Sequence, residues 1–255
     1  MITIKKPDEF EKMATAGATV AAVLRAVKEA AAPGVTMTEL DAIAADIIRA
    51  RGCTPSFLGY LGFPAHICTS PNSVIVHGIP NTYRLKEGDI LSVDAGAIFE
   101  GFHGDAAISF GIGEIDPFAQ RLLETTEAAL WAGIQEVKHG ARIGDIGNAV
   151  QAEADRLGYG VVREYVGHGI GRQMHEEPQV PNFGKKGTGM KLRTGMAVCI
   201  EPMFNLGGAE TKVEADGWTV VTADGSLSAH FEHTIAITEN GTVVFTADDL
   251  FSGSD

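Results

Sequence analysis

The stretch LKEGDILSVD at residues 85–94 decides the fold, because a related stretch, LRTGMAVCIE, returns at residues 192–201. The two align with a leucine, a basic residue, a glycine and a final carboxylate in register, at an offset of 107 residues. Gly34 and Gly140 match at nearly the same offset, 106 residues. A period of this length within one chain indicates an internal duplication.

The hydrophobic periodicity around these stretches alternates between helix and strand. Thr36 and Glu39 form a capping-box pattern, which places a helix start there. Apolar three- and four-residue spacing predicts helices from Pro7 to the stop at Pro33-Gly34, from Thr36 to Gly52, from Pro117 to Gly140 and from Gly144 to Gly158. Strands are predicted at Ser73–His77, Asp89–Asp94 and Asp105–Phe110, with a second strand-rich run after Gly158. We therefore expect one α+β domain over 1–255, with halves of about 1–115 and 116–255, a curved, mostly antiparallel sheet and helices on its outer face.

Composition excludes several classes of protein. The chain has 255 residues, of which 45% are hydrophobic and 21% charged, as in ordinary globular domains. Thirty-three acidic against 20 basic side chains give a formal charge of −13, the wrong sign for binding nucleic acid. The start of the sequence resembles no signal peptide, and no apolar run is long enough for a membrane span. The three widely spaced cysteines favour a reducing compartment, so we expect a cytoplasmic protein without membrane or nucleic-acid partners.

Four acidic residues lie inside apolar strand runs: Asp94, Asp105, Glu201 and Glu232. If the two halves meet about a pseudo-twofold axis, carboxylates at equivalent positions converge near that axis. An unpaired buried carboxylate is costly, so a cation must compensate. Buried ion pairs are one alternative, but the flanking residues offer no lysine or arginine. Two divalent metal ions, bridged by shared carboxylates, are the stronger interpretation.

His168, in the glycine loop GHGIG at 167–171, is the natural nitrogen ligand for such a site, although a lone histidine is often structural. The glycines lack the strand, helix and acid context of a dinucleotide-binding loop. We expect structural roles, and no metal, for five other histidines: His66, His103, His139, His230 and His233.

These residues belong to a motif series that resembles the type I methionine aminopeptidases. The motifs are VHGIP (76–80), SVD (92–94), GFHGD (101–105), VGHGIG (166–171), HEEP (175–178), IEPM (200–203), DGW (216–218) and FEHT (231–234). They cover nearly the whole chain, in the order and at the spacing of that family. The resemblance implies the pita-bread fold and the metal-dependent removal of the initiator methionine from nascent proteins whose second residue is small.

Carried over position by position, the resemblance implies a centre of two divalent ions. Asp94 would be the terminal bidentate ligand of one ion, Asp105 and Glu232 would bridge, and His168 and Glu201 would complete the second ion. The metal could be Co, Mn, Fe, Zn or Ni, since sites of this kind accept several.

The resemblance also implies catalytic roles for three residues. Glu201 would take and return the proton, and His175 would donate to the carbonyl oxygen as it becomes tetrahedral. His77 would hold the peptide nitrogen and assist its departure.

The implied substrate pocket holds three departures from the commonest family pattern. Phe57 stands where a cysteine is frequent, Phe63 where a tyrosine is frequent, and Met174 where a phenylalanine is frequent. Cys68 either lines the pocket or simply packs in the core, and no nucleophilic role is expected for it. The full set of expected pocket residues is Phe57, Tyr60, Phe63, Cys68, His77, Met174, His175 and Trp218.

Three related kinds of protein are alternatives. Aminopeptidase P and prolidase, which cleave before proline, carry a large N-terminal domain, whereas the first helix here is expected at about residue 7. Type II methionine aminopeptidases carry a long insertion between the last two glutamate ligands, but Glu201 and Glu232 are only 31 residues apart. A relative that has lost catalysis and only binds peptides would have lost ligands, and all five are present.

The expected partners are the N-termini of nascent polypeptides. Bacterial relatives are thought to dock on the ribosome through basic side chains on the hairpin before the Gly-Trp motif. Residues 207–225 contain only Lys212 as a basic residue, against four acidic ones. We therefore expect weak ribosome contact through this hairpin, and a monomer.

Overall fold

The structure is a computed structural model that describes residues 2–247, and it confirms the α+β architecture. The sequence predicts a frayed end at 251–255, and these residues lie outside the described ones. Within them, the helices are α1 (Pro7–Ala30), α2 (Met37–Ala50), α3 (Pro117–Gln135) and α4 (Ile143–Leu157), with a turn of 3₁₀ helix at Tyr60–Gly62. None of these helices combines the length and apolar character that a membrane crossing requires.

The helix ends follow local chemistry. Thr36 Oγ1 accepts a hydrogen bond from the Glu39 N–H at 3.2 Å, and the Glu39 carboxylate accepts one from the Thr36 N–H at 2.7 Å. This is the predicted capping box. Helix α4 ends at Gly158, whose φ of 74° is the left-handed conformation that favours glycine. Helix α3 stops before the predicted Gly140, because the chain tightens into bonds to carbonyls three residues back at Glu136 and Val137.

All the described strand pairs are antiparallel. The strands of the first half are β1 (Thr54–Pro55), β2 (Ile67–Pro71), β3 (Val74–Val76), β4 (Ile90–Phe99) and β5 (Phe102–Gly111). Those of the second half are β6 (Gly160–Val161), β7 (Gly167–Gly169), β8 (Glu176–Val180), β9 (Ala197–Ile200), β10 (Met203–Asn205), β11 (Thr211–Val213), β12 (Val220–Thr222), β13 (Ser228–His230), β14 (His233–Thr238) and β15 (Gly241–Val244).

The strands form four hydrogen-bonded groups. In the first half β1, β4 and β2 are neighbours and β5 pairs with β4, while β3 of that half joins β11 and β12 of the second. The second half also contributes the order β15-β14-β9-β7-β8 and the smaller group β13-β10-β6. Two helices followed by strands thus occur in each half, in the order that the sequence predicts.

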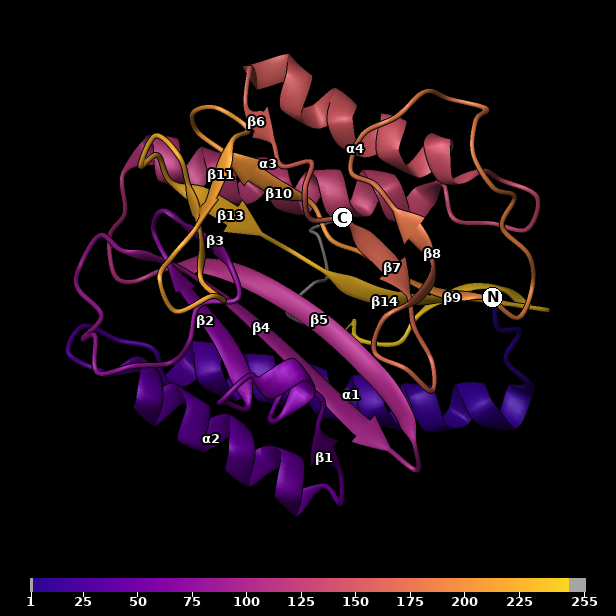
Figure 1. Ribbon diagram of the computed structural model, residues 1–255, viewed down its shortest axis with the longest axis horizontal. Coiled ribbons are helices and arrows are strands. Elements are labelled where there is room, and N and C mark those ends of the chain that lie inside the picture. Colours follow the sequence, from indigo (N-terminus) through magenta and orange to yellow (C-terminus); the bar gives the residue numbers. More distant parts are fainter. Residues whose placement is uncertain (1, 248–255) are drawn as a thin grey trace.

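The two halves meet beside the longest strands. Ala107 of β5 bridges Glu232 in both directions, with N–H to carbonyl distances of 3.2 and 2.9 Å. Figure 1 shows β5 running beside the segment between β13 and β14 at this point. Strand β4 continues to Phe99, beyond its predicted end at Asp94, because small residues let it pass close to the 54–57 segment. A Cβ on Gly96 would lie 2.7 Å from that of Ser56.

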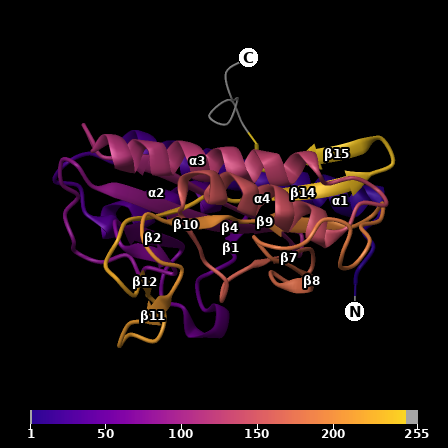
Figure 2. The same ribbon diagram turned by 90° about the horizontal axis from the view of Figure 1, so that it is seen from above.

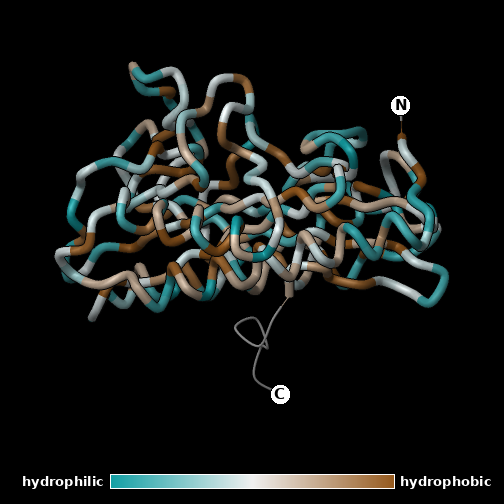
Figure 3. Tube along the Cα trace, turned by 90° about the horizontal axis from the view of Figure 1, so that it is seen from below, coloured by the Kyte–Doolittle hydropathy of each residue, from teal (hydrophilic) through white to brown (hydrophobic). Residues whose placement is uncertain are grey.

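The helices cover one side of the curved strand layer (Figure 2), as predicted, and β7, β8, β11 and β12 lie on the opposite side. Figure 3 shows apolar segments concentrated in the middle of the molecule, whereas many of the outer loops are hydrophilic. The buried face of α1, which includes Met13, Val20, Leu24 and Val27, packs against β4 and β5. Because the helices cover the outer side of the strand layer, polar side chains can gather on its inner, concave side.

Candidate metal centre and pocket

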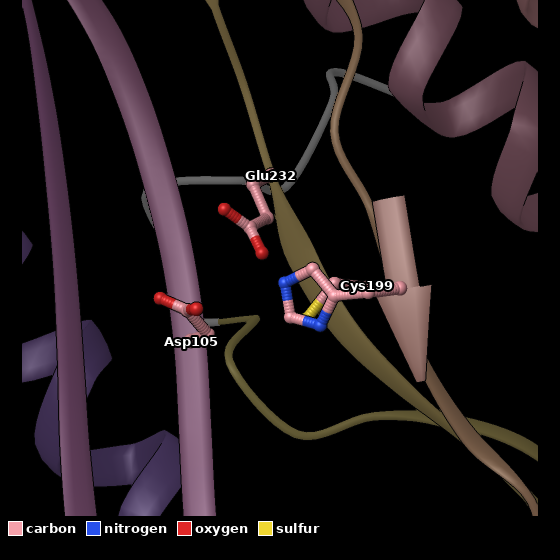
Figure 4. Close-up of side chains that lie close together, drawn as sticks. Asp105, Cys199 and Glu232 are labelled. Atoms are coloured by element: carbon pink, nitrogen blue, oxygen red, sulfur yellow. The ribbon is translucent and has the colours of Figure 1, made fainter. Parts of the chain in front are cut away.

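Four carboxylates from both halves gather where the halves meet. Asp94 lies in β4 and Asp105 in β5, while Glu201 follows β9 and Glu232 precedes β14. Asp94 of β4 pairs with Ala107 of β5, and Ala107 in turn bridges Glu232. Three neighbouring segments, β4, β5 and the segment before β14, therefore each carry an acid close to the place where the two halves meet. Figure 4 shows the side chains of Asp105, from β5, and Glu232, from the segment before β14, turned toward each other. The predicted convergence of the acids is what the fold produces.

Several carboxylate oxygens of these acids are buried without a hydrogen-bond partner. One oxygen each of Asp94, Asp105 and Glu232 is buried without a hydrogen bond. Burial raises the pKa of Asp105 to about 7. Burial and then the neighbouring carboxylates raise the pKa values of Asp94, Glu201 and Glu232 well above the usual range. Such a cluster needs compensating positive charge to ionise at neutral pH.

Within residues 2–247, the ion pairs of these acids are with imidazoles rather than with lysine or arginine. His168 Nε2 lies 3.5 Å from Glu201 Oε1. The Nδ1–H of His168 donates to the Gly169 carbonyl at 2.9 Å, so the lone pair of Nε2 is available to a cation. Burial, followed by the nearby His175, lowers the pKa of His168 to about 3, so this imidazole is neutral. Buried oxygens and a neutral nitrogen are the donors that divalent transition metals bind.

Cys199 is a neighbour of this cluster that sequence reasoning did not assign. Its sulfur and ligand atoms of Asp105, His168 and Glu232 all lie within 4.8 Å of one another. Burial, and then the charges of Glu232 and Asp105, raise the pKa of this thiol well above its usual range. Since a metal binds the thiolate, Cys199 serves here as a packing group, with Thr234 Oγ1 at 3.6 Å from its sulfur.

The acids and His168 line a cavity of about 230 Å³. An apolar cluster of Phe57, Phe63, Cys68 and Met174 lies in the same cavity wall. The ring of Phe63 meets that of Trp218 edge to face at 5.1 Å. The structure brings all the predicted substrate residues to this one cavity: Phe57, Tyr60, Phe63, Cys68, His77, Met174, His175 and Trp218.

Two of these residues, His77 and His175, are neutral imidazoles. Burial lowers the pKa of both, that of His77 to about 4, with a further contribution from His175. The Tyr60 hydroxyl lies 2.8 Å from His175 Nδ1. When this hydroxyl donates, the proton of His175 sits on Nε2. His77 has a left-handed φ of 60°, uncommon for a residue with a side chain, and its ring stands edge-on to Tyr165 at 5.5 Å.

Five residues line the cavity without having been predicted there: Leu61, Val76, Tyr165, Val166 and His230. Leu61 is 81% exposed and has a left-handed φ of 48° in the turn at Tyr60–Gly62. His230 lies two residues before Glu232. The two-residue period of a strand would have placed both side chains on one face and is the signal that could have found it.

Known proteins resemble this chain over almost its whole length. A sequence model of metallopeptidase family M24 matches residues 11–239. The chain is 48% identical over 246 residues to a methionine aminopeptidase of Clostridium perfringens, covering 96% of this chain and 99% of that protein. It is 47% identical over 246 residues, with the same coverage, to methionine aminopeptidase 1 of Bacillus subtilis.

Solved structures of known proteins also resemble this chain. The crystal structure of a methionine aminopeptidase from Thermotoga maritima matches with a TM-score of 0.95 and 45% identity, over 97% of this chain and all of that one. A prolidase from Pyrococcus furiosus matches with a TM-score of 0.78 and 21% identity, over 96% of this chain and 66% of that one. The second likeness concerns the fold alone. Together they confirm the expected pita-bread fold.

Proposed function

This chain belongs to metallopeptidase family M24, among its methionine aminopeptidases, and we propose that it removes the N-terminal methionine of nascent proteins whose second residue is small. The observation that carries the proposal is one cavity that joins four carboxylates and a neutral imidazole to an apolar wall. The polar group fits divalent metal, and the apolar wall fits an unbranched thioether side chain.

The donor set supports two metal ions. Their charge would satisfy the oxygens of Asp94, Asp105 and Glu232 that have no hydrogen bond. The residues that would hold the ions are Asp94, Asp105, His168, Glu201 and Glu232. When bound, the ions supply Lewis acidity, which lowers the pKa of water toward neutrality and polarises the scissile carbonyl group.

Glu201 is the residue that moves the proton. It follows β9 directly, and its carboxylate reaches the cavity beside His168. From there it takes a proton from the attacking water and returns it to the peptide nitrogen as the C–N bond breaks. The methionine and the shortened peptide with a new amine are the products.

The two cavity histidines act on the peptide group. With Tyr60 donating to Nδ1, His175 presents an Nε2–H that donates to the carbonyl oxygen as negative charge develops there. His77 binds the nitrogen of the leaving peptide. Both are neutral at physiological pH, so each can donate a hydrogen bond without bringing a charge that would compete with the metals.

The apolar wall selects the first residue. Phe57, Phe63 and Met174 surround the space in which a methionine side chain loses contact with water. Burial of such a side chain contributes roughly 1.5–3 kcal/mol, which favours methionine strongly over alanine or glycine at the first position.

The test removes one bridging charge at a time. In Asp105→Asn and Glu232→Gln proteins we expect bound metal to fall, and turnover of a Met-Ala peptide to fall at least about 100-fold, because each change deletes a ligand charge. Metal content by mass spectrometry and kcat on the same samples measure this. Asp46→Asn, an exposed acid on α2, is the matched control and should change neither.

Full activity of metal-depleted Asp105→Asn protein would contradict the metal mechanism. Faster cleavage of a peptide bond before proline than of Met-Ala would instead favour a prolidase-type activity.

We also propose a cytoplasmic monomer whose partners are nascent N-termini, without nucleic-acid or membrane partners. The three buried cysteines are free, as suits a reducing compartment. The net charge of −13 disfavours nucleic acid. One chain supplies all the candidate ligands, so a second copy is not needed to complete the centre. Ribosome contact through the β11–β12 hairpin is proposed to be weak.

A further inference from the structure

His230 is a buried histidine in the cavity with no role in the mechanism above. It ends β13, is 2% exposed and lines the same cavity as the acids. Its backbone is fixed on both sides, since its N–H donates to Ser109 Oγ at 2.9 Å and its carbonyl accepts from that hydroxyl at 2.7 Å. Its Nε2 is buried without a hydrogen-bond partner. A rigidly held imidazole with an unsatisfied nitrogen is arranged to bind something else.

The neighbours of that nitrogen are acids. Nε2 of His230 lies 3.8 Å from Glu232 Oε2, which is too long for a hydrogen bond. Glu201, His230 and Glu232 each offer a ligand atom within 4.8 Å of the others. Ligand atoms about 2.1 Å from one ion lie roughly 3.0–4.2 Å apart, so 3.8 Å is the spacing of two ligands on a shared ion. The 3.5 Å between His168 and Glu201 is a spacing of the same kind.

We propose that His230 Nε2 is a further ligand of the metal centre, bound to the ion that Glu201 and Glu232 also hold. This inference rests on the metal centre of the proposed function. That ion then has two imidazole nitrogens, from His168 and His230, instead of one. A second nitrogen donor favours the later divalent transition metals, such as Fe, Co, Ni or Zn, over Mg.

The experiment counts the nitrogens on the metal. Chelated protein is loaded with one equivalent of Mn²⁺ and examined by pulsed EPR with ¹⁴N- and ¹⁵N-labelled histidine, which detects directly bound imidazole. We expect two coupled nitrogens in the unaltered protein, and one in either His230→Gln or His168→Gln. His139→Gln is the matched control, because His139 is exposed and bonded to Thr194; it should keep two.

Co²⁺ affinity by calorimetry is the second readout, and we expect His230→Gln to bind about 10- to 100-fold more weakly. Two nitrogens in the unaltered protein support the inference even if the variants do not fold. One nitrogen, lost only in His168→Gln, overturns the inference and leaves the metal centre intact. No coupled nitrogen, with Mn²⁺ binding no tighter than in Asp105→Asn protein, overturns the metal centre and the inference together.

Discussion

Met174 is the residue that best separates this pocket from its commonest form. It is 9% exposed and packs in the apolar cluster with Phe57 and Phe63, directly before His175. A thioether side chain adapts its shape more readily than an aromatic ring. We therefore expect Met174→Phe to raise the kcat/KM ratio for Met over Leu peptides, since only about 1 kcal/mol of shape separates the two side chains.

The measurement is kcat/KM on matched Met-Ala and Leu-Ala peptides, with the preference for a small second residue unchanged. Met190→Phe, at an exposed position, is the control. An unchanged ratio, or slower Met turnover with Leu turnover unaffected, would mean that Met174 does not shape the pocket.

Individual site residues differ in how far the sequence could predict them. Asp94 and Asp105 stood out because a carboxylate in an apolar strand demands compensation. The VHGIP motif predicts His77, but it does not predict the left-handed backbone of this residue or the position of its ring beside Trp218, which is far away in the sequence. For His230 the sequence alone favours a structural role, because a single histidine is common in packed interiors, and only its two-residue spacing from Glu232 points to the acid cluster.

At the scale of elements, the segment before α1 is joined by a buried ion pair to β8, the strand that begins directly after His175. Lys5 Nζ lies 2.8 Å from Glu176 Oε2, and both side chains are almost fully buried. The Lys5 N–H also donates to the Gly195 carbonyl at 2.7 Å. Removing one member of a buried ion pair leaves the other charge uncompensated, which typically costs about 3–5 kcal/mol.

We expect Lys5→Met to lower the free energy of unfolding by that order and to lower kcat with metal content unchanged, because Glu176 adjoins His175. Urea unfolding and metal analysis check this. The double change Lys5→Met with Glu176→Leu should recover most of the stability, since the pair is then replaced by apolar groups. If Lys5→Met lowers the free energy of unfolding by less than about 1 kcal/mol, the Lys5–Glu176 ion pair does not stabilise this part of the fold.

The β11–β12 hairpin gives an electrostatic prediction. Lys212 lies on β11 and is already paired with Glu214 at 2.9 Å, among several acids. We expect Lys212→Ala to change ribosome affinity less than about twofold, because a single phosphate contact contributes little. Binding measured at two salt concentrations tests this, and a salt-sensitive affinity abolished by that one change would contradict it.

Elements were more predictable than their lengths. The starts of α1 and α2 and the end of α4 follow from proline, capping-box and glycine chemistry that acts within a few residues. The extension of β4 to Phe99 does not follow from local chemistry, because the alanines and the glycine at 95–97 carry no strand signal. These residues are extended because β1 and β5 pair with them on either side.

At the scale of the whole molecule, the buried acids and histidines set the pH dependence of the metal-free protein. The raised pKa of Asp105, about 7, means that the folded state holds a proton that the unfolded chain has already lost. Stability from such an acid is present below about pH 4 and is lost as the pH rises through 7. Asp94, Glu201 and Glu232 act in the same direction.

The buried histidines act in the opposite direction at lower pH. Burial is the main cause that lowers the pKa values of His168 and His230 to about 3. The folding stability that these two histidines contribute is therefore fully present above pH 6.5, the pKa of an unfolded histidine, and is lost as the pH falls below it. Above pH 6.5 the histidines no longer change the stability, and the buried acids make it fall as the pH rises. We therefore expect the Tm of chelated protein to fall by several degrees from pH 6.5 to 8.5, at roughly 1.4 kcal/mol per pH unit for each late-ionising acid.

Metal-loaded protein should not show this fall, because the bound charge replaces the protons. Asp105→Asn, which cannot ionise at this position, should reduce the fall in chelated protein. An equal Tm at both pH values after chelation would contradict the assignment.

The position of the acids along the chain has a consequence for how the protein is made. The first, Asp94, lies in β4, and the last, Glu232, belongs to the segment that bridges Ala107 of β5. Translation delivers these residues in order, with His168 and Glu201 between them. Until the segment around Glu232 leaves the ribosome, the emerging chain presents only an incomplete acidic surface. A truncated product that ends before Glu232 lacks the last of these acids. The complete set of candidate ligands therefore exists only in a chain that has been translated through Glu232, so we expect the metal to bind late in synthesis.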